Sequence, residues 1–421
     1  MSHFSCRVGQ PSETEGLQAV RLIMNATRRA AKFVGRQICQ SCIAVLLLAG
    51  FSFSQAPVST NWIQFHFTAD GTRRNPSETV LNPGTVAGLK LKWRYKTGSF
   101  IYSSPAVVDG VVYIGSGDYN VYALNARTGV EIWKYPTGAY VLYSSPAVVN
   151  GVVYVGSWDD NVFALKADTG TEIASYTTGY YVDSSPAVTN GMVFIGSADQ
   201  NLYALNAANL SKIWSFAAAP GEVTSNPTVV GGVVYFSTDY NVYALDARTG
   251  VQRWNYLAGG PVYSSPTVVN GVVYVGSDDF NVQALDASTG EKLWSYMTGG
   301  YISISSPAVA DGVVYVGSHD NKIYALDAKT GDKLWDYETN GIVNSSPAVA
   351  DGVVYVGSED NSVYALDAKT GAYLWSYTTD DPIDSSPTVV NGVLYVSSED
   401  AYVYAFALPD GSKPDGSKNE K

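Results

Sequence analysis

Few residues of this 421-residue chain have the types and spacing that chemistry requires. Cys39 and Cys42 have the C-x-x-C spacing of a redox pair or of half a metal site. The remaining cysteine is Cys6, and the only histidines beyond residue 56 are His66 and His319. These few residues argue against a Cys–His or Ser–His–Asp nucleophile and against a zinc site. We therefore expect no catalytic residue and no metal ligand beyond residue 56.

All three cysteines lie in a segment that is typical of a secretory leader. Basic residues between 28 and 36 precede the apolar run 43–53, and small residues lead up to Ala56. This order predicts a signal peptide over residues 1–56, cleaved after Ala56, with Met24 as an alternative start. The run is too short to span a bilayer, and Phe51 stands where a lipidated cysteine would be needed. We expect a periplasmic or secreted product with no membrane span, lipid anchor, disulfide or thiol.

Eight aspartates recur at one place of a repeat, which could suggest a cation site. They are Asp118, Asp159, Asp199, Asp239, Asp279, Asp320, Asp360 and Asp400. Identical use in every repeat points to a local role instead. We interpret each carboxylate as the cap of its own turn, where it accepts backbone N–H hydrogen bonds.

The repeat that positions these residues covers most of the chain. Its Ser-Ser-Pro, or once Ser-Asn-Pro, recurs at intervals of 39 to 41 residues, with prolines at Pro105, Pro146, Pro186, Pro227, Pro266, Pro307, Pro347 and Pro387. Each unit has two apolar runs joined by Asn-Gly or Asp-Gly, with one Gly-Gly variant, which predicts a hairpin. Two further short strands follow in each unit. Four antiparallel strands per unit predict an all-β fold, a single eight-bladed β-propeller.

A tryptophan marks the fourth strand of each unit and shows how the ring closes. The tryptophans are Trp93, Trp133, Trp214, Trp254, Trp294, Trp335 and Trp375, with Ala174 at the equivalent place of one unit. We expect them to fill the wedges between neighbouring blades, and the wedge at Ala174 to be less filled. The strand over residues 89–95 precedes the first Ser-Ser-Pro, so we predict that this N-terminal strand completes the last blade.

These features predict a connecting segment over residues 57–88, a propeller over 89–408 and a disordered tail over 409–421. In the connecting segment we expect His66, Arg73 and Arg74 at the surface. The net charge is −12, and it becomes −16 without residues 1–56, which hold six Lys or Arg and two Glu. Nucleic acid is therefore a poor partner, and we expect a monomer.

The motif Asp-Ala-x-Thr-Gly followed by tryptophan, as in residues 327–335 and 367–375, resembles the pyrroloquinoline-quinone-type (PQQ-like) repeat. The resemblance covers residues 60–407, and the segment 62–93 is similar to the start of quinoprotein alcohol dehydrogenases. It implies an eight-bladed propeller, found both in those dehydrogenases and in BamB-type scaffold proteins of outer-membrane β-barrel assembly. The dehydrogenases carry a vicinal disulfide and long insertions with calcium and catalytic carboxylates. This chain has neither, so the resemblance implies PQQ with Ca²⁺ only as an alternative.

Irregular positions of the repeat indicate where a site would lie. The loop into each blade and the turn between its second and third strands share one face, and aromatic residues gather there. The binding candidates are Tyr102, Tyr119, Tyr140, Tyr143, Trp158, Tyr181, Asp183, Tyr263, Asn344 and Asp384. Such residues suit a protein or peptide partner in the cell envelope, a small ligand or a glycan. A non-enzymatic scaffold is predicted, with a PQQ-dependent dehydrogenase and a carbohydrate-binding module as alternatives.

Overall fold

The Asn-Gly and Asp-Gly pairs form the predicted hairpin turns in the computed structural model, which describes residues 61–69 and 71–409. Both turn residues have positive φ, for example 52° at Asn150 and 74° at Gly151, and this is the geometry that suits the twist of the flanking strands. The predicted signal peptide with its cysteines and the tail from residue 410 lie outside the described residues.

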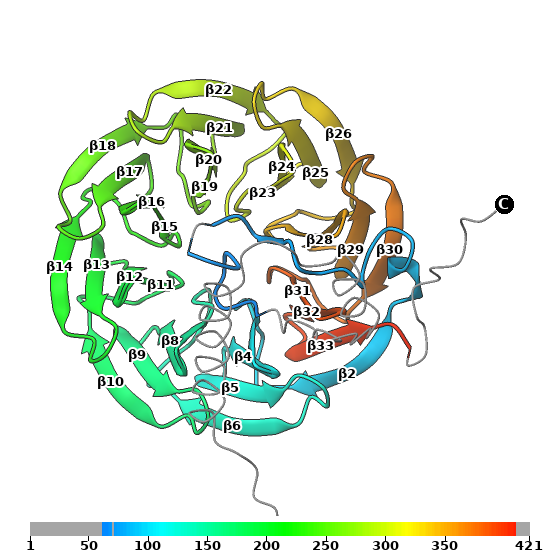
Figure 1. Ribbon diagram of the computed structural model, residues 1–421, viewed down its shortest axis with the longest axis horizontal. Helices are drawn as coiled ribbons and strands as arrows, with labels where there is room; N and C mark the ends of the chain where they lie inside the picture. Colours follow the sequence, from blue (N-terminus) through cyan, green and yellow to red (C-terminus); the bar gives the residue numbers. More distant parts are fainter. Residues whose placement is uncertain (1–60, 70, 410–421) are drawn as a thin grey trace, which may run out of the picture. The chain divides into compact units, whose positions relative to one another are not determined.

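The described chain forms eight sheets arranged as blades around a central channel (Figure 1). The innermost strands are β3 (Ala106–Val108), β7 (Ala147–Val149), β11 (Ala187–Thr189), β15 (Thr228–Val230), β19 (Thr267–Val269), β23 (Ala308–Ala310), β27 (Ala348–Ala350) and β31 (Thr388–Val390). The second strands are β4 (Val111–Gly115), β8 (Val152–Gly156), β12 (Met192–Gly196), β16 (Val233–Ser237), β20 (Val272–Gly276), β24 (Val313–Ser318), β28 (Val353–Gly357) and β32 (Val393–Ser397). We number the blades 1 to 8 in this order.

The two outer layers complete each blade. The third strands are β5 (Asn120–Asn125), β9 (Asn161–Lys166), β13 (Asn201–Asn206), β17 (Asn241–Asp246), β21 (Asn281–Asp286), β25 (Lys322–Asp327), β29 (Ser362–Asp367) and β33 (Tyr402–Ala407). The outermost strands are β6 (Glu131–Pro136), β10 (Glu172–Thr177), β14 (Lys212–Ala217), β18 (Gln252–Leu257), β22 (Lys292–Met297), β26 (Lys333–Glu338), β30 (Tyr373–Thr378) and β2 (Lys90–Lys96). Third strands are mostly buried and outermost strands alternate between exposed and covered residues, as expected of inner and edge strands.

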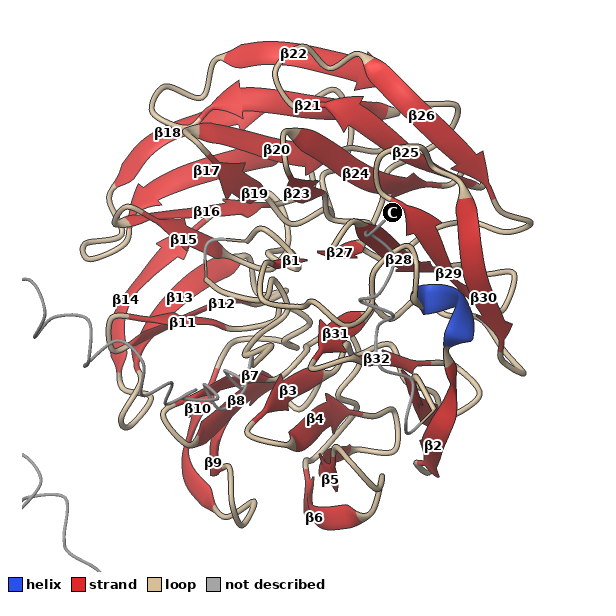
Figure 2. Cartoon of the chain, turned by 45° about the vertical axis from the view of Figure 1, so that its right-hand side comes forward, coloured by secondary structure: helices blue, strands red, loops and turns tan. Residues whose placement is uncertain are grey.

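The ring closes through β2, which pairs antiparallel with β33 and places Trp93 opposite Ala405. The predicted eight-bladed, all-β fold and its closure by an N-terminal strand are confirmed. Blade 7 gains a fifth strand, because β1 (Arg74–Asn75) pairs parallel with β27 near the channel axis (Figure 2). The one helical element of the described chain is a single 3₁₀ turn, η1 (Val86–Gly88), and no described helix has the length and apolarity to cross a bilayer.

The tryptophans join neighbouring blades, as the contact of blade 1 with blade 2 shows. Trp133 Nε1 donates to the carbonyl of Ala167 at 2.9 Å, and Tyr113 Oη donates to the same oxygen at 3.2 Å. Gly170, at φ 68°, lies against the indole, where an added Cβ would come within 2.7 Å of the ring. The flat ring and the glycine therefore form one close contact between the two blades.

The contact of blade 2 with blade 3 is filled in another way. Ala174 replaces the tryptophan, and Leu210 replaces the facing glycine even though φ is 55° there. Leu210 is 1% exposed and belongs to the apolar cluster against which Ala174 packs. A leucine side chain therefore stands at this contact in place of the tryptophan–glycine pair seen between blades 1 and 2.

Residues 62–69 and 71–75, which we name the plug segment, run inside the ring of blades (Figure 1). The segment exchanges hydrogen bonds with the innermost strand of every blade in turn. Backbone groups make five of these contacts. Trp62 pairs with Val107 of blade 1, and the N–H groups of Val148, Val229, Val309 and Val349 on blades 2, 4, 6 and 7 donate to the carbonyls of Ile63, Ala69, Thr72 and Arg73. On blades 3, 5 and 8 a side chain takes part, in the pairs Gln64–Val188, Thr267–Gly71 and Asn75–Val389. The plug segment thus contacts all eight blades around the channel.

The expectation that His66 and Arg73 lie at the surface is wrong, because they are 4% and 0% exposed. Arg73 donates to the carbonyls of Pro347, Pro387 and Phe65, so backbone oxygens of two blades and of the plug segment surround the cation. Burial lowers the pKa of Arg73 to about 9, and burial together with the Arg73 charge lowers the pKa of His66 to about 3. Arg74 is partly exposed and forms an ion pair with Asp311 at 2.8 Å.

Candidate functional site

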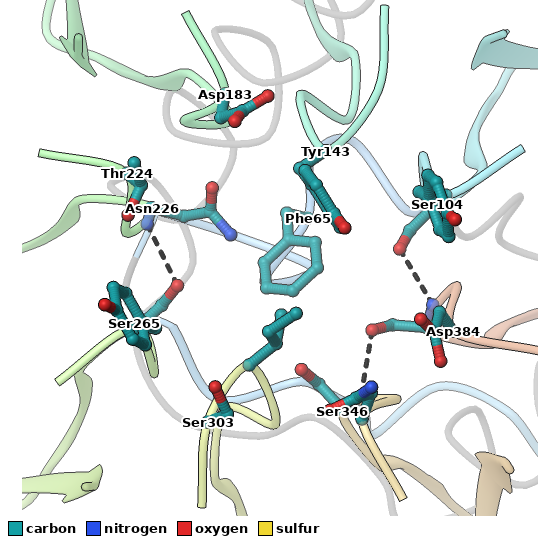
Figure 3. Close-up of a pocket in the computed structure, with 15 residues that line it drawn as sticks. Phe65, Ser104, Tyr143, Asp183, Thr224, Asn226, Ser265, Ser303, Ser346 and Asp384 are labelled. Carbon is teal, nitrogen blue, oxygen red and sulfur yellow. Dashed lines mark hydrogen bonds between the residues drawn. The ribbon is translucent and has the colours of Figure 1, made fainter. Parts of the chain in front are cut away.

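The channel opens on one face into a cavity of about 310 Å³, which we name the mouth cavity. Each blade contributes the residue that precedes its Ser-Ser-Pro or Ser-Asn-Pro, namely Tyr102, Tyr143, Asp183, Thr224, Tyr263, Ile304, Asn344 and Asp384. These positions share one backbone role but differ in chemistry from blade to blade. Phe65 of the plug segment lies in the middle of the ring of lining residues (Figure 3). The mouth cavity is therefore closed below by the plug segment and shaped by the irregular positions of the repeat.

A closed ring of hydrogen bonds holds this wall together. In every blade the N–H of the second residue of Ser-Ser-Pro donates to the side-chain oxygen of its counterpart in the next blade, as Ser104 does to Ser145 at 2.9 Å and Ser265 to Ser306 at 2.9 Å. The ring returns from blade 8 to blade 1, where the N–H of Ser386 donates to Ser104 at 2.9 Å. A side-chain oxygen at this place thus links successive blades; it is a serine hydroxyl in seven blades and the amide oxygen of Asn226 in blade 4.

The turn aspartates also serve the frame of the mouth. Asp118 Oδ1 accepts the N–H of Asn120 at 3.1 Å, and its Oδ2 accepts the N–H of Gly98, in the loop that follows β2, at 2.6 Å. The same pattern recurs in most blades, so these carboxylates cap their own turns and tie each to the preceding blade. At Asp239 the pattern differs, because Thr238 Oγ1 accepts the N–H of Asn241 at 3.3 Å.

A continuous row of aromatic rings crosses the face over blades 1 to 3. Neighbouring ring centroids lie 4.6 to 6.2 Å apart along this aromatic row, which comprises Tyr143, Tyr102, Phe100, Tyr140, Trp158, Tyr181 and Tyr180, with Tyr119 against Tyr140. Tyr102 and Tyr143 are stacked, with centroids 5.1 Å apart and planes at 18°. The row begins inside the mouth cavity and ends at the exposed Tyr180. It provides a path of ring surface from solvent into the cavity.

Two carboxyls, one buried and one partly buried, flank the stacked tyrosines. Asp183 on blade 3 is 9% exposed and accepts the Nε1–H of Trp158 at 2.5 Å. Burial raises its pKa to about 6, with a smaller contribution from Glu222. Burial, followed by the charges of Glu359 and Glu399, raises the pKa of Asp384 on blade 8 to about 7. Both groups titrate near neutral pH because the wall shields them from water.

A chain of polar side chains extends from blade 6 to blade 7 on the same wall. His319 Nε2 and Asn344 Oδ1 lie 2.8 Å apart, and Asn344 Nδ2 donates to Glu359 Oε1 at 2.8 Å. Tyr102 Oη donates to Glu399 Oε2 at 3.3 Å. Polar groups of the wall are thus oriented by their neighbours.

Six of the ten candidate residues line the mouth cavity, namely Tyr102, Tyr143, Asp183, Tyr263, Asn344 and Asp384. The other four, Tyr119, Tyr140, Trp158 and Tyr181, lie outside it in the aromatic row. Phe65 and Glu399 were not among the candidates. Glu399 occupies the same repeat position as Trp158 and Glu359, so the repeat register could have identified it. Phe65 belongs to no repeat unit, and nothing in the pattern marked it.

The wall does not suit PQQ bound through a metal ion. PQQ is a tricarboxylate, so its binding requires basic side chains or a cation. Of the cavity's lining residues, all within the described chain, none is Lys, Arg or His, and two are Asp. Among residues 61–69 and 71–409, no group of three or more His, Cys, Asp or Glu side chains is placed to hold a metal ion. Two carboxyls that already resist ionisation would oppose a third anion.

Two family models match the sequence. The model described as "Outer membrane protein assembly factor BamB" matches residues 136–256, 217–342 and 338–414. The model described as "Glucose/ethanol/alcohol dehydrogenase, beta-propeller domain" matches residues 62–142. A quinohemoprotein alcohol dehydrogenase of Pseudomonas putida is 38% identical over 77 residues, which are 18% of this chain and 11% of that enzyme. The chain thus matches about a tenth of the length of this curated relative.

Solved structures share the fold over most of the chain. A europium-containing methanol dehydrogenase superposes with a TM-score of 0.73 at 16% identity, over 83% of this chain and 98% of the enzyme. BamB from Moraxella catarrhalis superposes with a TM-score of 0.65 at 20% identity, over 76% of this chain and 99% of that protein. A quinohemoprotein alcohol dehydrogenase from Comamonas testosteroni superposes with a TM-score of 0.72 at 18% identity, over 83% of this chain and 80% of the enzyme. Enzymes and BamB therefore share this architecture, and function has to be argued from the site.

Proposed function

This chain belongs to the PQQ-like repeat β-propeller family, and on that premise we propose that it is a non-enzymatic scaffold outside the cytoplasm that binds a protein or peptide partner. The partner would bind on the face that carries the mouth cavity and the aromatic row, which we name the mouth face. One observation carries the proposal. The positions at which the side chain varies from one repeat unit to the next lie together, around one cavity and along one continuous row of aromatic rings. Rigid aromatic surface with oriented polar neighbours is typical of protein-recognition sites.

Two further observations support the place and the chemistry. The leader-like sequence of residues 1–56 and the match to an outer membrane protein assembly factor favour a location in the cell envelope. The acidic wall of the mouth cavity disfavours PQQ and therefore the dehydrogenase alternative. A glycan is the second candidate, because the aromatic row offers ring faces on which sugars stack.

The test is capture of binding partners from envelope extracts by the immobilised exported protein. We expect a discrete protein to be retained by the wild type and lost by the Tyr102→Ala, Tyr143→Ala, Trp158→Ala triple variant. The matched control replaces three exposed residues of the outermost strands, Tyr373→Ala, Leu257→Ala and Met297→Ala, and should retain the protein. Circular dichroism checks that both variants are folded.

Parallel assays separate the alternatives. Elution of the captured material by soluble oligosaccharides, with no protein retained, would favour the glycan alternative. Reduction of a dye with alcohols or sugars after addition of PQQ and Ca²⁺ would contradict the scaffold proposal. Equal capture by the wild type and the aromatic triple variant would place the binding surface elsewhere.

A further inference from the structure

The two faces of the propeller differ in charge. The loops of the mouth face, between the second and third strands and between successive blades, carry seventeen Asp or Glu and no Lys or Arg. The loops of the opposite face combine acids with Arg127, Arg248, Lys329 and Lys369. Several of the seventeen acids cap turns, but a hydrogen-bonded carboxylate keeps its charge. The mouth face therefore has a negative field that attracts cations.

The mouth cavity combines carboxyls with aromatic rings. Asp384, Tyr102, Tyr143 and Asp183 follow one another on blades 8, 1, 2 and 3, so the stacked tyrosines lie between the two acids (Figure 3 labels Asp183, Tyr143 and Asp384). Asp384 Oδ1 accepts no hydrogen bond from the described chain. A carboxyl that is shielded from water and incompletely hydrogen-bonded is compensated best by a cation with N–H donors.

The size of the cavity limits what can enter. About 310 Å³ lies at the lower end of the range for ligand pockets, roughly 300 to 1,000 Å³. This space suits one long side chain, and the aromatic row extends from it across blades 1 to 3 toward solvent. A side chain whose cationic head lies near the acids would place its apolar stem beside the tyrosine rings. The stem then packs on the rings, and the charge interacts favourably with the ring faces.

From the cavity, the charge and the aromatic row together, we propose that the mouth face binds a basic polypeptide segment and takes one of its arginine or lysine side chains into the mouth cavity. Asp384, whose Oδ1 has no hydrogen bond from the described chain, pairs with the cation, and Asp183 adds negative charge to the same wall. Tyr102 and Tyr143 contact the stem, and the flanking peptide lies along the aromatic row. This inference rests on the proposed function and adds the chemical class of the partner. Arginine fits better than lysine, because its planar guanidinium both stacks on rings and pairs with carboxylates.

The test uses the exported full-length protein and three fluorescein-labelled heptapeptides with Gly, Ser and Leu flanks and a central Arg, Gln or Glu. Fluorescence anisotropy at pH 8 should show binding of the Arg peptide, at least tenfold weaker binding of the Gln peptide, and none of the Glu peptide. The Asp183→Asn, Asp384→Asn variant should lose at least tenfold in affinity for the Arg peptide. The matched control, Asp168→Asn with Asp351→Asn, makes the same charge change at exposed residues of the opposite face and should stay within twofold.

Other results would overturn the inference. Equal affinities for the Arg and Gln peptides, equal losses in the two Asn variants, or no peptide binding would each show that the cavity does not select a cationic side chain. Spermidine binding as tightly as the Arg peptide would show that the site takes a small cation and not a polypeptide. If capture of the envelope partner still depends on the aromatic row in any of these cases, the proposed function stands and only its basic partner is wrong.

Discussion

Replacing Asp384 with asparagine should stabilise the propeller at neutral pH and weaken the pH dependence of its unfolding. Burial and the neighbouring Glu359 and Glu399 raise the pKa of this carboxyl to about 7, whereas an aspartate in an unfolded chain titrates near 4. The unfolded state therefore loses the proton near pH 4 and the folded state near pH 7. The free energy of unfolding should fall as the pH rises through this window and then level off.

The magnitude follows from about 1.4 kcal/mol for each pKa unit. A difference of about three units gives roughly 4 kcal/mol of destabilisation above pH 7, and about 3 kcal/mol of this loss should occur between pH 5 and pH 8. Asparagine keeps the shape of the side chain and cannot ionise. The Asp384→Asn variant should therefore lack this part of the loss, while Asp183, whose pKa is raised to about 6, contributes a smaller part in both proteins.

Urea unfolding at pH 5, 6, 7 and 8 measures the effect, with the exposed Asp168→Asn as control. The gain from Asp384→Asn should increase with pH, and Asp168→Asn should stay within about 0.5 kcal/mol of the wild type throughout. A gain that is absent at pH 8, or one that does not change with pH, would refute the reasoning that this carboxyl is buried without full compensation.

Three further predictions concern the frame. Trp133→Ala should lower the free energy of unfolding by about 3 to 5 kcal/mol, because it removes the ring that fills a contact between two blades. Ile132→Ala truncates an exposed residue of the same strand and should lower it by less than about 1 kcal/mol. Similar losses in the two variants would contradict the role of Trp133 between blades. Arg73→Ala should cost about 3 to 5 kcal/mol in urea unfolding, because buried carbonyls lose their donor, and Arg74→Ala less than about 1 kcal/mol. Deletion of residues 57–97 should expose the edge of β33 and give aggregation in size-exclusion chromatography; a monomer with wild-type melting would rule out this closure.

The repeated part of the fold could be predicted because each signal is local and occurs in every unit. The Asn-Gly pairs have the predicted turn geometry. Trp93 marked a fourth strand that precedes the first complete unit, and the structure places this strand in blade 8, as predicted. The same register placed the eight residues before Ser-Ser-Pro around one opening. Repetition therefore predicted both the architecture and the wall of the mouth cavity.

The plug segment could not be predicted in this way. Arg73 and His66 are polar residues in a segment without a repeat, and such residues are usually exposed. The burial of Arg73 depends on backbone carbonyls that precede the innermost strands of blades 7 and 8, an arrangement that exists only after the ring has closed. Leu210 shows a similar limit, because its role depends on Ala174 in the preceding blade, 36 residues away in sequence.

Photo-crosslinking in the living cell tests most directly whether the mouth face is the partner-binding surface. A benzoylphenylalanine would replace Tyr119, an exposed residue of the aromatic row, or Tyr373, an exposed residue of the outermost strand β30. We expect a discrete crosslinked protein from position 119 and none from position 373. A folded protein that gives no crosslink from position 119, or the same crosslink from both positions, would contradict partner binding at the mouth face.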